Sequence, residues 1–369
     1  MSVNTLKRCL VATTVGLTMS WLTIGEAFAY TYTKIADTSN PNFTSFGRYP
    51  IINNAGNVVF AANLAPDGGA TSIVIGNGGQ TTTIAAANTS NVFSLFGNVP
   101  VLNDLGTVAF RANLDSIGSS IFTINKGTVN TIASSSTATG AFDEPKINND
   151  NVILFAGSSN TGRAVFRSSG GKTTTIADTQ GEISNFYGYT INDVGTAAFV
   201  TRLDVGGYAL YLNTNGVSNR LIYTKDPYSP FSFLYTPAMN NLGTLVFKAL
   251  RKIGGQGVFT TDGQSTVTIA DNVSSFNFFE NPAINDAGKV VFKGVLKNGT
   301  LGIYTGADPV ADKVVAAGDK LFGSTVTDLY VSSKSLNNNS QVVFYAKLAD
   351  GTTGIYRADP DTGVVEAQP

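Results

Sequence analysis

The twelve residues NDLGTVAFRANL, at positions 103–114, return in closely related form as NDVGTAAFVTRL at 192–203 and NDAGKVVFKGVL at 285–296. Aligning an Asn with a Phe seven residues later finds seven copies along the chain. The Phe residues stand at positions 60, 110, 155, 199, 247, 292 and 344, so neighbouring copies are 44 to 52 residues apart. The Asn-to-Phe spacing is constant, whereas the intervals between copies vary. We therefore expect fixed strands joined by loops of variable length.

Each repeat contains further short apolar pieces around this motif. In the second copy, FGNVPVLN (96–103) precedes it, and SIFTI (120–124) and VNTIA (129–133) follow it. These pieces are rich in Val, Ile, Thr and Phe and are bounded by Gly, Asn and Asp, which is typical of strands. Four strands in a repeat of this length indicate a propeller blade. We predict an all-β fold, a seven-bladed β-propeller of four-stranded antiparallel blades. A β-solenoid is the alternative, although its coils are usually shorter.

The segment Asn-Asp-x-Gly between the first two strands of a repeat predicts a hairpin turn. Asn and Asp side chains bind nearby backbone N–H groups, and Gly adopts the left-handed conformation that closes such a turn. Asn151 and Ser340 replace this Gly in two copies, and Ser tolerates the conformation less well than Asn. The residues to which we assign this structural turn role are Asn53, Gly56, Asn103, Gly106, Asn192, Gly195, Asn240, Gly243, Asn285 and Gly288.

Closing a ring of seven blades requires one more strand of the Thr-rich kind. The sequence offers two candidates, YTKIAD at 32–37 and GVVEA at 363–367. We expect one of them to pair beside the last repeat, and the sequence does not choose between them.

The first 29 residues have the pattern of a secretory signal peptide. Lys7 and Arg8 precede an apolar run over 9–24, and Ala27 and Ala29 form an A-x-A cleavage site. A membrane anchor is the alternative, but the run is short for a span of about 20 apolar residues. We expect cleavage after Ala29, which leaves 30–369 as a single seven-repeat domain without a membrane span. The predicted location is extracellular or at the cell surface, with the periplasm as the other possibility.

Composition excludes several classes of activity. The chain has no His, and its single Cys, Cys9, lies in the predicted signal peptide. Ser-His-Asp and Cys-His catalysis therefore lack their base, and ordinary zinc, haem and copper sites lack their ligands. No phosphate-binding glycine motif is present, so we expect no cofactor. With 24 Lys and Arg against 25 Asp and Glu, bulk charge does not favour a nucleic-acid partner.

The connections from the fourth strand of one repeat to the first strand of the next are long and variable, which suits binding. They carry recurrent acids and aromatic residues, a combination that could hold a sugar polymer or a divalent cation. The candidate ligand-binding residues are Asp37, Asp178, Asp226, Asp271, Asp319, Tyr187, Tyr189 and Tyr235. The alternative is that these acids cap turns and the aromatics fill the core.

A second pattern is basic. The residue after the repeated Phe is Arg111, Lys248 or Lys293 in three copies, and Arg202 and Lys347 lie nearby in two others. These side chains could form a stripe for an acidic ligand. The alternative is that they extend along apolar surface with their charges in water.

The copies NDLGTVAF and NDVGTAAF resemble the motif of secreted bacterial proteins with tandem NxxGxxAF repeats and varied surface anchors, the choice-of-anchor type. The resemblance covers the chain from residue 30 onward. It implies a β-propeller-like architecture and no particular activity. Such proteins often have a C-terminal sorting tail, and because this sequence ends in GVVEAQP we expect release or retention by a partner.

We therefore predict a secreted repeat scaffold that acts as a binding or interaction module for an unknown protein or polysaccharide. One alternative is a carboxylate-based hydrolase or lyase acting on extracellular polysaccharide. Its acids would be drawn from Glu144, Glu182 and Glu280, acting with a Tyr or Lys. The other alternative is a structural component of an extracellular matrix. An enzyme is the less favoured interpretation because no complete catalytic set is present.

Overall fold

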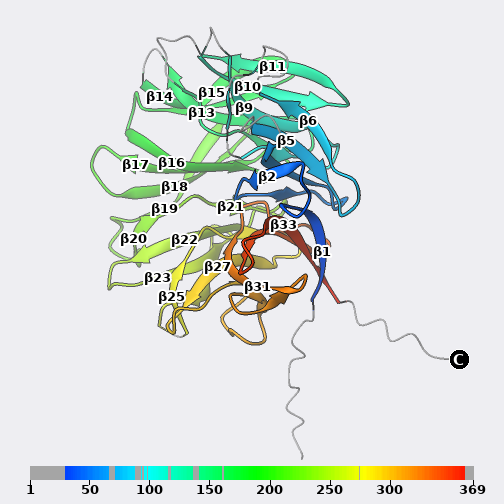
Figure 1. Ribbon diagram of the computed structural model, residues 1–369. Helices are drawn as coiled ribbons and strands as arrows, with labels where there is room; N and C mark the ends of the chain where they lie inside the picture. The colour runs from blue at the N-terminus through cyan, green and yellow to red at the C-terminus, as the bar shows by residue number, and fades with distance from the viewer. Residues whose placement is uncertain are drawn as a thin grey trace, which may run out of the picture.

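The computed structural model describes residues 30–65, 71–87, 93, 95–97, 99–114, 118–135, 141–159, 162–273 and 275–361. These residues form seven antiparallel sheets that follow one another in chain order around a common axis (Figure 1). The predicted seven-bladed β-propeller is confirmed, and the solenoid alternative is wrong. No described segment forms a helix that could cross a membrane. The predicted signal peptide, 1–29, lies outside the described residues.

Each blade is built from strands A to D in chain order, with A nearest the axis and D outermost. Blade 1 contains β2 (Phe43–Phe46), β3 (Ile51–Ile52), β4 (Val58–Leu64), β5 (Thr71–Gly76) and β6 (Thr82–Ala86). Blade 2 contains β7 (Leu95–Phe96), β8 (Val101–Leu102), β9 (Val108–Leu114), β10 (Gly118–Asn125) and β11 (Thr128–Ser134). Blade 3 contains β12 (Lys146–Ile147), β13 (Ile153–Ser159), β14 (Gly162–Ser169) and β15 (Lys172–Asp178). Blade 4 contains β16 (Ile183–Ile191), β17 (Ala197–Leu203), β18 (Tyr208–Thr214) and β19 (Val217–Tyr223).

Blades 5 and 6 follow the same order, whereas the outer strand of blade 7 comes from the start of the chain. Blade 5 contains β20 (Phe231–Leu234), β21 (Ala238–Met239), β22 (Leu245–Arg251), β23 (Gln256–Thr261) and β24 (Thr266–Asp271). Blade 6 contains β25 (Phe276–Phe279), β26 (Ala283–Ile284), β27 (Val290–Leu296), β28 (Leu301–Tyr304) and β29 (Lys313–Ala316). Blade 7 contains β30 (Lys320–Leu321), β31 (Ser324–Tyr330), β32 (Val342–Leu348), β33 (Thr353–Pro360) and β1 (Tyr30–Asp37).

Strand β1 closes the ring. It pairs antiparallel with β33 from Tyr30 opposite Pro360 to Asp37 opposite Gly354, and so forms the outer strand of blade 7 (Figure 1). The first of the two closing candidates is therefore the one used. The second, 363–367, lies outside the described residues. Because the two ends of the chain share one sheet, the last blade depends on both of them.

Strand A is broken in four blades where the sequence suggested one continuous piece. The break falls at a proline, which has no N–H for the ladder. These prolines are Pro50, Pro100, Pro237 and Pro282. Blade 4 has no proline at this place, and its strand A runs unbroken over β16. In each of these four blades both pieces of strand A pair with strand B, and the proline and the residues just before it lie between them.

The repeated Phe residues fill the space between blades. None of the seven is more than 1% exposed. In blade 2, for example, Phe110 packs against Phe93, Phe96 and Phe122 at ring-centroid distances of 5.6 to 5.7 Å. Burying each of these side chains contributes about 2 kcal/mol relative to exposure.

Candidate functional site

The A–B turns meet at one end of the axis, which we call the asparagine face. At each turn the glycine has the left-handed backbone that the motif requires, for example Gly106 with φ of +79° and Gly243 with φ of +84°. Asn151 and Ser340 adopt the same conformation, with φ of 58° and 59°.

The first Asn of each turn joins its blade to the next. We call Asn53, Asn103, Asn148, Asn192, Asn240, Asn285 and Asn337 the asparagine ring. The Nδ2 of each donates to the backbone carbonyl of the next member at 3.0–3.2 Å, and Asn337 returns to Asn53. Each Oδ1 accepts from the backbone N–H four residues later at 2.8–3.0 Å. The same side chain therefore closes the turn and links the blades.

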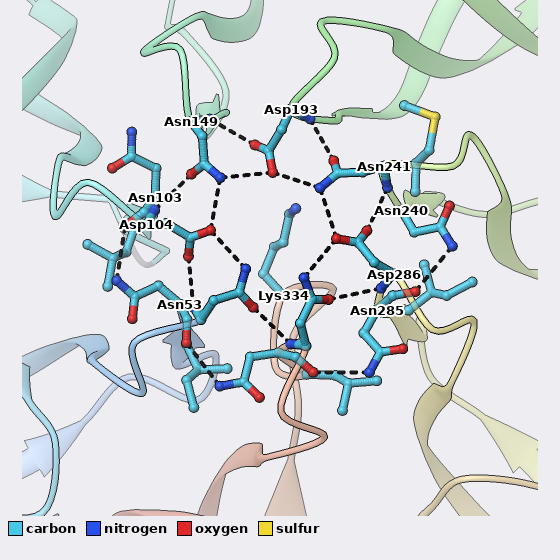
Figure 2. A pocket seen from close by; sticks show the side chains of 18 of the residues that line it. Asn53, Asn103, Asp104, Asn149, Asp193, Asn240, Asn241, Asn285, Asp286 and Lys334 are labelled. Atoms are coloured by element: carbon cyan, nitrogen blue, oxygen red, sulfur yellow. Dashed lines mark hydrogen bonds between the residues drawn. The ribbon is translucent and has the colours of Figure 1, made fainter.

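The second residue of each turn forms a parallel ring, which we call the Asn/Asp ring. Its members are Asn54, Asp104, Asn149, Asp193, Asn241, Asp286 and Asn338. Each backbone N–H donates to the Oδ1 of the next member at 2.7–2.9 Å. The Oδ2 of every Asp accepts from the amides of the Asn on both sides at 2.7–3.0 Å (Figure 2). Donors and acceptors thus alternate around the axis.

This alternation is visible in the sequence, where the turns read Asn-Asn and Asn-Asp in turn. The sequence reasoning explained each turn locally and missed the link between turns. Seven is odd, so Asn338 stands next to Asn54 where the alternation cannot continue.

Lys334 occupies the middle of the Asn/Asp ring. Blade 7 has two more residues between Leu329 and Asn337 than blade 6 has between Phe279 and Asn285. Figure 2 shows the Lys334 side chain inside the circle of Asn and Asp residues. A cavity of about 70 Å³ remains there, walled by Ile52, Leu102 and other residues that precede the asparagine ring. This end of the axis is therefore narrow and hydrogen-bonded, which suits a structural role.

The opposite end of the axis holds two adjoining hollows of about 340 and 540 Å³, which share Lys146 and Thr236. We call them together the loop-face cavity, because the D–A and B–C connections lie on this face. All seven blades contribute to its wall. Its charged and aromatic residues include Tyr49, Arg111, Glu144, Lys146, Tyr189, Tyr235, Lys248, Phe278 and Glu280.

The acids of this cavity are held by cations. Arg111 lies 3.3 Å from Glu144. Lys293, only 6% exposed, lies 3.1 Å from Glu280 and 3.7 Å from Asp328. Its ammonium also sits 3.7 Å from the centre of the Tyr330 ring. Asp143, which also lines the cavity, pairs with Arg163, so each carboxylate of the cavity lies in an ion pair.

Two lysines of the cavity have no such partner. Lys248 is 5% exposed and Lys146 is half-buried, and neither makes an ion pair with the described residues. Burial lowers the pKa of Lys248 below the ordinary value for lysine, and the charge of Glu280 opposes this shift. Burial likewise lowers the pKa of Lys146, with Glu144 opposing and Lys334 reinforcing the effect. Glu144 and Glu280, each also paired with another cation, thus balance these two ammonium groups only in part.

The five predicted acids lie elsewhere. Each is on or just after the outer strand of a different blade. None of them is among the described residues that line the loop-face cavity. Asp37, Asp178, Asp226 and Asp271 each accept from the backbone N–H two residues later at 2.9–3.2 Å. Asp319 accepts from the Ala316 N–H at 2.9 Å and pairs with Lys313 at 3.0 Å. These contacts are those of turn caps, and they leave the five acids apart.

The three predicted tyrosines lie closer to the axis. Tyr235 lines the cavity. Tyr189 also lines it, but its hydroxyl donates to the Glu144 carbonyl at 2.7 Å and accepts from the Ala156 N–H at 3.1 Å. Burial raises the pKa of Tyr189 far above its usual value. Tyr187 is 37% exposed and packs against Phe233.

The predicted basic residues and Glu182 also differ in whether they line the cavity. Among the basic residues after the repeated Phe, Arg111 and Lys248 line the cavity and Lys293 lies behind it, whereas Arg202 and Lys347 are exposed. Glu182 lies away from the cavity and accepts from the Tyr211 hydroxyl at 2.5 Å.

Sequence reasoning missed Lys146 as a cavity residue. It follows Pro145 at a place where other repeats carry Ile51, Val101, Ala238 or Ala283, so a charge on an apolar strand was the available signal. No group of three or more Asp, Glu, His or Cys side chains arranged to hold a metal ion occurs in the part of the chain that the structure describes.

Comparison with known proteins supports the fold and leaves the activity open. A family model described as "Family of unknown function (DUF7453)" matches residues 29–141 and 119–362. No curated protein sequence matches the chain. A puromycin-hydrolysing peptidase from Mycobacterium tuberculosis is similar in structure, with a TM-score of 0.58 and 12% identity over 90% of this chain and 55% of that one.

Two further solved structures are similar. Oligogalacturonate lyase from Vibrio parahaemolyticus has a TM-score of 0.53 and 12% identity, over 91% of this chain and 98% of that one. TolB from Acinetobacter baumannii has a TM-score of 0.45 and 17% identity, and this chain covers 62% of its length. At 12% identity, the peptidase and the lyase show a shared propeller fold alone.

Proposed function

The chain belongs to this family of unknown function, and we propose that it is a binding module whose ligand occupies the loop-face cavity. The observation that carries the proposal is the contrast between the two ends of the axis. The asparagine face is tied together by two rings of hydrogen bonds. The other end is open and concave, and it is lined by residues from every blade, many of them aromatic or charged. Ligands usually bind in such concave sites with a few polar groups, and on variable loops held by a rigid scaffold.

We further propose that the module acts outside the cytoplasm, on a protein or polysaccharide. The signal-peptide pattern of residues 1–29 and the resemblance to secreted NxxGxxAF-repeat proteins support this location. Intact-mass measurement of the protein from the culture medium and from periplasmic extract tests it. A mature chain beginning at Tyr30 is expected. A chain that keeps residues 1–29 and stays in the cytoplasm would contradict the proposal.

A thermal-shift screen of residues 30–369 tests the binding function. The panel contains soluble polysaccharides, cell-wall fragments and divalent cations. A ligand at 100 times its dissociation constant stabilises the folded state by about 2.7 kcal/mol, which is a shift of a few degrees for a chain of this size. Tyr235→Leu should remove the shift because Tyr235 lines the cavity. Tyr228→Leu is the matched control, since Tyr228 is 96% exposed and lies outside the cavity.

A carboxylate-based hydrolase or lyase is the second candidate, because Glu144 and Glu280 line the two adjoining hollows. Both acids are ion-paired, Glu144 with Arg111 and Glu280 with Lys293. The test is release of new chain ends from polysaccharide by the protein and by Glu144→Gln and Glu280→Gln. Activity unchanged in both variants excludes these acids. A structural matrix component would instead self-associate, which sedimentation of the purified chain detects.

A further inference from the structure

A strip of aromatic rings crosses the loop face and ends in the cavity. It contains Tyr187, Tyr208, Phe233, Tyr235 and Phe278, from blades 4 to 6. Phe233 is the centre of the strip, with ring centroids 5.6 Å from Tyr187, 4.3 Å from Tyr208 and 4.7 Å from Tyr235. Phe278 is 41% exposed, and the other rings are partly exposed. A row of partly exposed rings offers flat apolar area to a ligand.

The strip leads to the unpaired lysines. The Lys248 ammonium lies 4.3 Å from the ring centre of Tyr235 and 4.2 Å from that of Phe278. It therefore stands between the last two rings of the strip. Lys146 faces the same hollow from blade 3. Aromatic contact stabilises a cation partly, but it does not replace a counter-ion at a buried site.

The charge of the cavity decides which ligand fits. Glu144 is already paired with Arg111, and Glu280 with Lys293, so neither is available to balance the two lysines fully. A neutral ligand would cover both ammonium groups and remove them from water without compensation, which is costly. A ligand that brings carboxylates supplies charge-assisted hydrogen bonds instead.

From this arrangement we propose that the ligand of the loop-face cavity is an acidic glycan. Its sugar rings lie on the aromatic strip and its carboxylates bind Lys146 and Lys248. Sugar rings have apolar C–H faces that pack on aromatic rings, and uronic-acid units carry one carboxylate each. A nucleic acid fits less well, because its binding needs a broad positive surface and the whole chain has a net charge of −1. This inference rests on the proposed binding function and adds the class of ligand.

Isothermal titration calorimetry of residues 30–369 tests the inference with three probes. They are a short uronic-acid oligomer, its carboxyl-reduced neutral counterpart, and a sulfated oligomer of the same length that has no carboxylates. The uronic-acid oligomer is expected to bind at least tenfold more tightly than the neutral one, and to weaken as salt is raised. Lys248→Met and Lys146→Met should each weaken it about tenfold.

Lys252→Met is the matched control, because Lys252 is exposed on the same face but lies outside the cavity. If a cavity variant does not fold, the affinities of the three oligomers for the unaltered protein still test whether the ligand must be acidic. Equal affinity for the acidic and neutral oligomers would contradict the proposal of an acidic ligand, but it would still support the proposed binding function. If the sulfated oligomer binds more tightly than the uronic-acid oligomer, the proposal that the cavity recognises carboxylates is wrong. No binding by any probe, together with a flat thermal-shift panel, would overturn both proposals.

Discussion

Replacing Asn241 with Asp tests the Asn/Asp ring most sharply, because it changes one NH2 group to an oxygen. The Asn241 amide donates to Oδ2 of Asp193 at 2.9 Å and to Oδ2 of Asp286 at 3.0 Å. Its Oδ1 accepts from the Asp193 N–H at 2.8 Å, a bond that a carboxylate would keep. The variant therefore loses two donors and places three carboxylates side by side.

The size of the effect follows from these contacts. Each hydrogen bond to a charged group contributes about 1.5–3 kcal/mol, so losing two costs about 3–6 kcal/mol. Repulsion between the carboxylates raises the pKa of the new acid, and protonation then restores one donor. One pKa unit corresponds to about 1.4 kcal/mol. We expect the free energy of unfolding to fall by about 4 kcal/mol at neutral pH.

The sign of the pH dependence is fixed by this raised pKa. Between the unfolded value of about 3.9 and the raised folded value, the folded variant binds more protons than the unfolded chain. Its stability relative to the unaltered protein therefore rises as pH falls through that window. Urea unfolding at about pH 7 and about pH 5 measures both effects.

Asn219→Asp is the control, because Asn219 is exposed on the outer strand of blade 4. A surface change of this kind should stay within about 0.5 kcal/mol. A loss below about 1 kcal/mol for Asn241→Asp, or a loss that does not change with pH, would refute the reasoning.

Three further predictions concern blade 7 and the cavity. Lys293→Ala leaves Glu280 and Asp328 without their shared cation, so urea unfolding should show a loss of about 3–5 kcal/mol, and an unchanged midpoint would contradict this. A chain that begins at Thr38 lacks β1 and exposes the edge of β33. Its melting temperature should fall, and light scattering should detect association through the exposed strand. A monomer with an unchanged melting temperature would count against closure of the ring by β1. Because the pKa of Lys146 is lowered, its charge is lost as pH rises before that of an ordinary lysine. Affinity for the uronic-acid oligomer should therefore be weaker at about pH 9.5 than at about pH 7, and Lys146→Arg should reduce this dependence to the part that Lys248 contributes.

The fold could be predicted from the sequence because the motif that determines it is short and is repeated along the chain. The spacing from Asn103 to Phe110 fixes a turn and a strand in one short segment, and seven copies with this spacing define the blades. The closing strand could not be predicted, because residues 32–37 and 363–367 are both short segments with strand-forming residues. Only pairing with β33 distinguishes them.

The candidate site was harder to predict, because its residues lie together in the fold but are of different amino-acid types. The acids Asp178 and Asp226 recur after outer strands, so they formed a pattern, yet their position reflects turn chemistry. Lys146, Tyr235 and Glu280 come from different blades and meet because each lies on or within strand A, the strand nearest the axis, of its blade. Contacts between distant segments leave no periodic trace in a single sequence.

The crystal structure of residues 30–369 with a short uronic-acid oligomer tests the central claim most directly. The account predicts sugar rings on Tyr235 and Phe278, with a carboxylate oxygen about 3 Å from the Nζ of Lys248 or Lys146. An oligomer bound at the outer-strand turns of Asp178 or Asp226, or on the asparagine face, with the loop-face cavity empty, would contradict it.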